Sequence, residues 1–251
     1  MKGSDSDEAR VTGRLLLSPS ILTADFARLG PEVASVAPIV DWFHLDVMDG
    51  HYVPNITFGP DIVAAIRKEV DTPFHVHLMI DEPLKYVERF ARAGARRISF
   101  HPEVVEDVEG AIEAVRETGA EPSLAVHPDI PVESVEKHLN RVAGVLMMTV
   151  RPGFGGQKFL HEAVPKIAYV RRLVEEGGFS AEIEVDGGVN LHTMDEAVTA
   201  GADILVAGSA IFDGKDAPAA ARRLRERLDL LASTAQEARS QEADAASGES
   251  N

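Results

Sequence analysis

Three apolar segments of the sequence end in residues that can bind a metal ion or carry a proton. They run from His44 to Met48, from His75 to Met79 and from Glu184 to Gly188. In each segment the polar residues stand two positions apart, so on a strand their side chains would share one face. Buried carboxylates are costly unless they are paired or bound to a metal. The alternative for any single histidine is a hydrogen-bonded core residue.

Two imidazoles and two carboxylates that converge at one rim would suit one divalent ion, Zn²⁺, Fe²⁺, Mn²⁺ or Co²⁺. The chain contains no cysteine, which excludes disulfides, thiolate ligands and a cysteine nucleophile. Any metal must therefore be held by His, Asp or Glu.

Glycines gather after three apolar segments in the second half of the chain. They form the clusters Gly153-Phe154-Gly155-Gly156, Gly187-Gly188 and Gly208-Ser209. Glycine permits a close approach of the backbone to a ligand. Loops after the last strands of a parallel barrel commonly bind phosphate through backbone N–H groups. The three clusters together predict a phosphate site, whereas any one pair alone would more often be an ordinary turn.

The elements that must position these residues are short apolar segments that alternate with amphipathic stretches. Such alternation is typical of parallel strands joined by right-handed helical crossovers, and eight strands are enough to close a barrel. The chain length of 251 residues matches a single barrel of roughly 250 residues. The eight predicted strands are Leu15–Leu17, Trp42–Val47, Phe74–Leu78, Arg97–Phe100, Leu124–Val126, Val145–Val150, Ile183–Val185 and Ile204–Val206.

We therefore expect an α/β protein with one domain, a (β/α)8 TIM barrel over residues 15–231. The ends, residues 1–14 and the acidic segment 232–251, lack apolar periodicity and are expected to be flexible, disordered tails. The formal net charge of −16 argues against nucleic acid as a partner. The sequence shows neither an apolar run of about 18 residues nor a secretory leader, so we expect a cytoplasmic protein without a membrane partner.

Six segments of the sequence resemble the motifs of the ribulose-phosphate 3-epimerase family, in the order of that family. The resemblance runs from about Leu15 to Phe212 and is highly specific in combination. The segments are Ser18–Leu22, His44–Asn55, Val76–Met79, Pro152–Gln157, Glu184–Val189 and Ala207–Phe212.

This resemblance implies a metal-dependent isomerase of the pentose phosphate pathway, which interconverts D-ribulose 5-phosphate and D-xylulose 5-phosphate. It implies one divalent ion per chain, with His44, Asp46, His77 and Asp186 as ligands and with Asp46 and Asp186 as the catalytic acid–base pair. We also expect a homo-oligomer. The residues expected to bind the ketose phosphate are Ser20, His77, Met48, Met79, Met148, Gly153, Phe154, Gly155, Gly156, Gly187, Gly188, Gly208 and Ser209.

Inversion of a carbon next to a carbonyl group explains why two aspartates would be needed. Removal of the proton at C3 leaves an enediolate, whose negative charge a metal acting as a Lewis acid would stabilise. A single group would return the proton to the side it left, so inversion needs a base on one face and an acid on the other. The like charges of Asp46 and Asp186 should push their titrations apart, so that only one carries a proton. For the three methionines we expect a polarisable, aprotic cover over the intermediate, with core gap-filling as the alternative.

Three positions depart from the usual pattern of the family. His75 stands where Asp is usual, Arg151 where Asn or Glu is usual, and His127 where Asn is common. Because His75 and Glu184 should both point inward beneath the ligands, we predict a hydrogen bond between them, direct or through one water. The alternative is that His75 bonds to a backbone carbonyl or to a different side chain.

Three other functions are compatible with parts of this pattern. The same site could serve an epimerase for a related substrate, such as a ketohexulose 6-phosphate. A metal-dependent hydrolase is suggested by the pair His75 and His77, although such barrels usually carry that pair on the first strand. A barrel that binds a sugar phosphate without turning it over is disfavoured, because all the expected ligands and acid–base groups are present.

Overall fold

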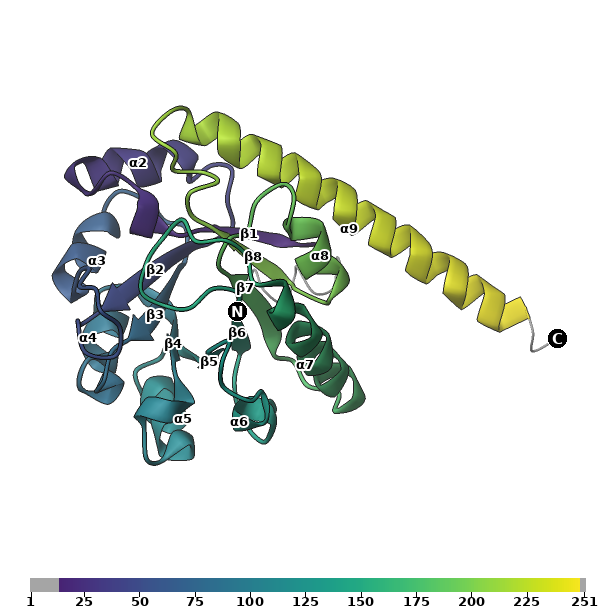
Figure 1. Ribbon diagram of the computed structural model, residues 1–251, viewed down its shortest axis with the longest axis horizontal. Coiled ribbons are helices and arrows are strands. Elements are labelled where there is room, and N and C mark those ends of the chain that lie inside the picture. Colours follow the sequence, from purple (N-terminus) through teal and green to yellow (C-terminus); the bar gives the residue numbers. More distant parts are fainter. Residues whose placement is uncertain (1–13, 249–251) are drawn as a thin grey trace.

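Eight parallel strands form the centre of the protein (Figure 1). The structure is a computed structural model that describes residues 14–248, with side chains as far as residue 234. The strands are β1 (Leu16–Pro19), β2 (Phe43–Met48), β3 (Phe74–Met79), β4 (Ala95–Phe100), β5 (Glu121–Val126), β6 (Gly144–Met148), β7 (Glu182–Asp186) and β8 (Ile204–Ala207).

Their pairing makes the sheet a nearly closed barrel. The strand order is β1-β8-β7-β6-β5-β4-β3-β2. Its two ends, β1 and β2, meet where Ser20 forms a parallel bridge with His44 and where the N–H group of Asp41 donates to the carbonyl of Leu17 at 2.9 Å. The predicted (β/α)8 TIM barrel is thereby confirmed, with strand bounds that differ from the predicted ones by a few residues.

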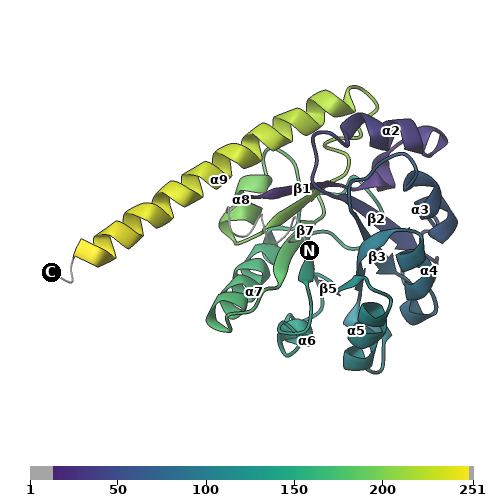
Figure 2. The ribbon, with the colours of Figure 1, turned by 180° about the vertical axis from the view of Figure 1, so that it is seen from behind.

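Helices surround this barrel on its outer side (Figures 1 and 2). They are α2 (Leu29–Val36), α3 (Pro60–Ile66), α4 (Val87–Arg92), α5 (Val108–Glu117), α6 (Glu133–Glu136), α7 (Val164–Glu176), α8 (Met194–Thr199) and α9 (Ala217–Gly248). Short 3₁₀ turns are η1 (Ile21–Thr23), η2 (Phe26–Arg28), η3 (Pro83–Lys85), η4 (Pro102–Val104) and η5 (His161–Ala163).

Helix α5 illustrates how local sequence sets these elements. Asp107 caps its first turn, where the carboxylate accepts the N–H of Gly110 at 3.0 Å. Ala111, Ile112 and Val115 recur at helical spacing and are the buried residues of the helix. The helix therefore packs one apolar stripe against the barrel and leaves its acidic face outside.

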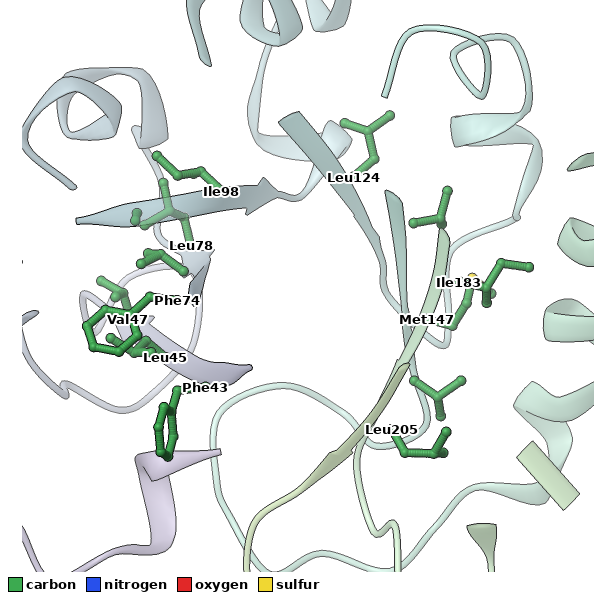
Figure 3. Packing of buried hydrophobic residues seen from close by; sticks show 14 of the residues in the cluster. Phe43, Leu45, Val47, Phe74, Leu78, Ile98, Leu124, Met147, Ile183 and Leu205 are labelled. Carbon is green, nitrogen blue, oxygen red and sulfur yellow. The ribbon is translucent and has the colours of Figure 1, made fainter. Parts of the chain in front are cut away.

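Strand alternation separates an apolar outer layer from a polar interior. Phe43, Leu45 and Val47 face the helices together with the apolar residues of the neighbouring strands (Figure 3). The intervening residues point into the barrel. Its buried polar residues include Ser18, His44, Asp46, His75, His77, Arg97, Ser99, Ser123, Glu182 and Glu184. Near the amino-terminal ends of β4, β5 and β7, Arg97 Nη2 lies 2.6 Å from Glu182 Oε2 and 2.9 Å from Glu121 Oε2. These two carboxylates neutralise the charge of the guanidinium inside the barrel.

The last helix is longer than the sequence indicated. Helix α9 starts beside α2, where Arg225 bonds to Asp41 and to the carbonyl of Leu15, and Figures 1 and 2 show it extending beyond the barrel to Gly248. A tail without regular structure was predicted from residue 232, but that segment is rich in Ala, Glu, Gln and Arg, which favour helix without an apolar face. None of the described helices is long and apolar enough to span a bilayer. The predicted N-terminal tail falls almost wholly outside the described residues.

Candidate active site

Asp46, near the carboxyl end of β2, is held by hydrogen bonds from two side chains. The hydroxyl of Ser20 donates to its Oδ2 at 2.6 Å, and its Oδ1 lies 3.2 Å from Nδ1 of His77. The register of the sheet causes this second contact, because Asp46 of β2 stands directly opposite His77 of β3. Burial would raise the pKa of Asp46, but the charge of His44 and the hydrogen bonds of His44 and His77 outweigh it and hold that pKa far below its usual value.

Asp186, at the end of β7, faces the opposite electrostatic situation. Its Oδ2 lies 3.9 Å from Nε2 of His44, and its side chain is 14% exposed. Burial first, and then the negative charge of Asp46, raise the pKa of Asp186 to about 7. The pKa values of the two aspartates are therefore displaced in opposite directions, and their roles as an acid–base pair stay a prediction.

All four predicted metal ligands lie close together at one end of the barrel. One donor atom each from His44, Asp46, His77 and Asp186 lies within 4.8 Å of the other three. Burial lowers the pKa of His77 to about 3, so this imidazole is neutral and able to bind a metal. Nε2 of His44 is buried, has no hydrogen-bond partner and faces the two aspartates. Burial opposes protonation of His44, yet the charges and hydrogen bonds of Asp46 and Glu184 hold its pKa well above the ordinary value. The carboxylates around His44 thus favour a positive charge at this position. The donor set therefore fits a divalent cation.

Glu184 supports the cluster from beneath. Its Oε1 lies 3.0 Å from Nδ1 of His44, and its Oε2 lies 2.5 Å from Nδ1 of His75. The predicted hydrogen bond between His75 and Glu184 is confirmed, and it is direct. Burial alone would raise the pKa of Glu184, but the two imidazoles lower it strongly. The carboxylate thus remains ionised and accepts a hydrogen bond from the N–H group at Nδ1 of His44, which leaves Nε2 of that ring for a metal.

A pocket opens above these residues. It is lined by every predicted substrate-binding residue except the fully buried His77, and of the predicted metal ligands His44 does not line it either. The predicted residues in its wall are Ser20, Asp46, Met48, Met79, Met148, Gly153, Phe154, Gly155, Gly156, Asp186, Gly187, Gly188, Gly208 and Ser209. The structure therefore brings the aspartates, the methionines and the three glycine clusters to one cavity, while the binding role of each residue stays a prediction.

Two of these glycines are required by the backbone itself. Gly187 and Gly188 have φ values of +122° and +66°, a region that favours glycine. A Cβ atom at Gly188 would lie 2.4 Å from the backbone nitrogen of Phe159, and one at Gly187 would lie 2.5 Å from the side chain of Val150. The loop after β7 thus packs against the segment after β6 more closely than any side chain allows.

The loop between β2 and α3 forms hydrogen bonds with the loops that follow β6 and β4. Asn55 Nδ2 donates to the carbonyl of Gly153 at 2.8 Å, and the hydroxyl of Tyr52 donates to Glu103 at 2.8 Å. Glu103 in turn lies beside His101, a fully buried residue directly after β4. Sequence reasoning missed Tyr52, His101 and Glu103 as members of the site. The signal available was a histidine directly after the fourth apolar segment, as at the other strand ends.

The other two departures from the family pattern lie at the outer rim. Arg151 donates from Nε and Nη2 to the two carboxylate oxygens of Asp129, each at 2.9 Å. His127 Nδ1 accepts the N–H of Asp129 at 3.1 Å. None of these three residues lines the pocket. Both substitutions therefore belong to one surface contact between the loops after β5 and β6.

A (β/α)8 barrel with paired aspartates and glycine-rich loops at the carboxyl ends of its strands defines a class, the barrel enzymes with an acid–base site at that end. Within this class the chain belongs to the ribulose-phosphate 3-epimerase family, because the sequence model of that family matches residues 16–212. The chain is 46% identical over 211 residues to the ribulose-phosphate 3-epimerase of Bacillus subtilis (strain 168), an alignment that covers 83% of this chain and 97% of that protein.

A second relative agrees with this assignment, and a solved structure agrees with the fold. The chain is 44% identical over 203 residues to the ribulose-phosphate 3-epimerase of Escherichia coli (strain K12), with 80% of this chain and 90% of that protein covered. Among solved structures, KGPDC from Streptococcus mutans superposes with a TM-score of 0.66 over 87% of this chain and 99% of that one, at 15% identity. At that identity the likeness concerns the fold alone. The hydrolase alternative finds no support, because His75 and His77 fall in different ligand groups.

Proposed function

We propose that the protein is a metal-dependent epimerase that interconverts D-ribulose 5-phosphate and D-xylulose 5-phosphate by proton transfer at C3. Membership of the ribulose-phosphate 3-epimerase family supports the reaction. The observation that carries the chemistry is the contrast between Asp46, whose pKa is far below the usual range, and Asp186, whose pKa is raised to about 7. One carboxylate is thus prepared to accept a proton while the other is prepared to give one.

The two aspartates come from different strands, β2 and β7, which are separated around the barrel by β1 and β8. A planar intermediate held between them would meet one carboxyl group on each face. Asp46 and Asp186 then exchange the roles of base and acid in the two directions of the reaction. Ser20 keeps Asp46 oriented through the 2.6 Å hydrogen bond to Oδ2. General acid–base groups of this kind typically contribute roughly 10²–10⁴-fold to a rate.

His44, Asp46, His77 and Asp186 would hold the divalent ion, and the separation of their donor atoms supports this assignment. When bound, such an ion supplies a Lewis acid that stabilises negative charge on the oxygens next to the reacting carbon. The cluster of Met48, Val53 and Met79 is buried beside Asp46. Thioethers offer no exchangeable proton, so Met48, Met79 and Met148 would exclude water from the proton in transit.

The phosphate end of the substrate would lie against the glycine clusters. Gly155 and Gly156 follow β6, Gly188 follows β7, and Gly208 follows β8. These loops would present backbone N–H groups without side chains in the way. We assign the reaction to the pentose phosphate pathway and the protein to the cytoplasm, as a homo-oligomer; family membership supports the pathway, and the location and assembly stay predictions.

The test of this function is an assay that detects D-xylulose 5-phosphate formed from D-ribulose 5-phosphate. It compares the protein as purified, after metal removal by a chelator, and after restoration with Zn²⁺, Fe²⁺, Mn²⁺ or Co²⁺. We expect activity to fall on removal and to return with at least one ion. Full activity in a metal-free preparation would refute metal dependence, and no activity under any condition would refute the epimerase assignment. A ketohexulose 6-phosphate assayed in parallel measures the preference for sugar length.

A further inference from the structure

His77 has a second imidazole as its neighbour on the side away from Asp46. Its Nε2 lies 2.9 Å from Nε2 of His101, and both side chains are fully buried. When two ring nitrogens face each other at this distance, one must donate a proton and the other must accept it. The direction of this single hydrogen bond therefore decides which nitrogen of His77 is free.

The surroundings of His101 set that direction. Its Nδ1 faces Oε1 of Glu103 at 3.3 Å and finds no hydrogen-bond partner of good geometry among the described residues. The hydroxyl of Tyr52 donates to the same carboxylate oxygen at 2.8 Å. An ionised carboxylate can only accept, so a proton on Nδ1 of His101 faces an acceptor, whereas a bare Nδ1 would face the lone pairs of Oε1. Nδ1 of His101 therefore carries the proton, and its Nε2 accepts the one on Nε2 of His77.

Ring contacts accompany this hydrogen bond. The ring of His101 contacts the ring of Tyr52 at a centroid distance of 4.8 Å, and it meets the ring of His77 edge to edge at a centroid distance of 5.1 Å. The planes are tilted by 38° and 34°, respectively. His101 is thus oriented by the ring of Tyr52, by the hydrogen bond with His77 and by a carboxylate at its other nitrogen.

We propose that His101, backed by Glu103 and Tyr52, is a positioning residue that fixes the tautomer of His77 with Nε2 protonated and Nδ1 free. Nδ1 of His77 faces Oδ1 of Asp46 at 3.2 Å, so it points into the candidate metal cluster. A metal bound at Nδ1 requires that nitrogen to be bare, and the neutral ring then carries its proton on Nε2. The arrangement mirrors that of His44, whose Nδ1 contacts Glu184 and whose Nε2 faces the cluster. Each imidazole ligand is then oriented through its other nitrogen by a chain of bonds that ends in a carboxylate. The inference rests on the proposed metal site.

The first experiment reads the tautomers directly in the unaltered protein. Side-chain ¹H–¹⁵N spectra of the ¹⁵N-histidine-labelled protein are recorded without metal and with one equivalent of Zn²⁺, and His101→Gln supplies the assignment. We expect His77 with Nε2 protonated and Nδ1 shifted by Zn²⁺, and His101 with Nδ1 protonated and Nε2 bare. A proton on Nε2 of His101 in the Zn²⁺-loaded protein would overturn the inference.

The second experiment removes the acceptor while it keeps the ring. His101→Phe keeps an aromatic ring beside Tyr52 but cannot accept a hydrogen bond, whereas the amide oxygen of His101→Gln can take the place of Nε2. Loss of such a supporting partner weakens metal affinity about 10–100-fold, so we expect that loss for His101→Phe and affinity near the parent value for His101→Gln. Affinity for Zn²⁺ is measured by competition with a chromophoric chelator, with the exposed His161→Gln as the control.

The two variants and a spectroscopic readout separate positioning from packing. The visible spectrum of the Co²⁺-loaded protein should change in intensity for His101→Phe and stay unchanged for His101→Gln. Equal Zn²⁺ affinity of the parent and His101→Phe, or equal losses in both variants, would contradict the inference. If His101→Phe does not fold, Tyr52→Phe and the tautomers of the parent decide the matter. Failure of the parent to bind Zn²⁺ at all would instead refute the metal site on which the inference rests.

Discussion

Nδ1 of His75 lies 2.5 Å from Oε2 of Glu184 inside the barrel, one layer below the aspartates of the pocket. Glu184 uses its other oxygen for His44, so a single carboxylate connects a residue that departs from the family pattern to a candidate metal ligand. The histidine at position 75 thus affects the orientation of Glu184 and leaves the four candidate metal ligands unchanged.

This contact predicts the effect of substitutions at position 75. His75→Ala should weaken metal affinity about 10–100-fold, because Glu184 loses one of its two donors and orients His44 less firmly. His75→Asp should be better tolerated than His75→Ala. Metal titration of the folded variants, with circular dichroism as a check on structure, measures both effects. Unchanged affinity in His75→Ala would show that Glu184 needs only His44.

The close packing of the loop after β7 predicts that Gly188 cannot be replaced. At a φ of +66°, a residue with a side chain costs on the order of 1–3 kcal/mol, and its Cβ would also collide with the backbone of Phe159. Gly188→Ala should therefore lower the melting temperature and raise KM for the ketose phosphate. The matched control is Gly119→Ala, which also has a positive φ but has open space around the added Cβ. If KM changed equally in both variants, the loop after β7 would have no special role in phosphate binding.

The raised pKa of Asp186 predicts how pH acts on the metal-free protein. Its folded-state pKa of about 7 lies above the ordinary value of 3.8, so the folded state holds the proton more tightly. The stability that Asp186 contributes is fully present below about pH 4 and is lost as pH rises through about 7. Neighbouring histidines titrate too, so the readout is the difference in free energy of unfolding between the parent and Asp186→Asn.

In the presence of a chelator, the free energy of unfolding of the parent relative to Asp186→Asn should fall between about pH 4 and pH 7. The stabilisation by added metal should be larger at about pH 8 than at about pH 5.5, because at the lower pH the metal must displace a proton from Asp186. Urea unfolding at each pH measures both quantities. A difference that does not vary with pH would contradict the raised pKa.

The ends of the chain should be dispensable for folding and turnover. Leu228 is buried and Leu231 is partly buried against the core, whereas Ser233 and Thr234 are exposed. Deleting residues 1–12 and 233–251 should therefore leave the melting temperature and kcat nearly unchanged. Scanning calorimetry and the epimerase assay compare the truncated and full chains. A large drop in either value would show that an end packs on the barrel or at an interface between copies.

Much of the barrel could be predicted from the sequence because its signals are local. The spacing of His44 and Asp46, or of Glu184 and Asp186, fixes which side chains share a strand face. The number of apolar segments fixes the barrel. The junction of β1 and β2 and the register that sets Asp46 opposite His77 depend on pairing between strands, which a single sequence does not encode in any local pattern.

The residues that sequence reasoning missed are those whose roles arise from distant contacts. His101 and Tyr52 are separated by about fifty positions, and their rings meet only because two loops fold over the same rim. The extension of α9 was missed for a different reason. Its last turns carry no apolar stripe, so hydrophobic periodicity did not indicate a helix there, although the helix propensity of the residues favours one.

The central claim, that Asp46 and Asp186 serve opposite faces of the substrate, is tested most directly by proton exchange in D₂O. Metal-loaded parent, Asp46→Asn and Asp186→Asn are incubated separately with D-ribulose 5-phosphate and D-xylulose 5-phosphate, and ¹H NMR follows the signal at C3. We predict that both variants lose epimerisation by about 10²–10⁴-fold, and that each retains exchange at C3 of only one epimer, a different one in each variant. Epimerisation by Asp186→Asn near the parent rate would contradict the account.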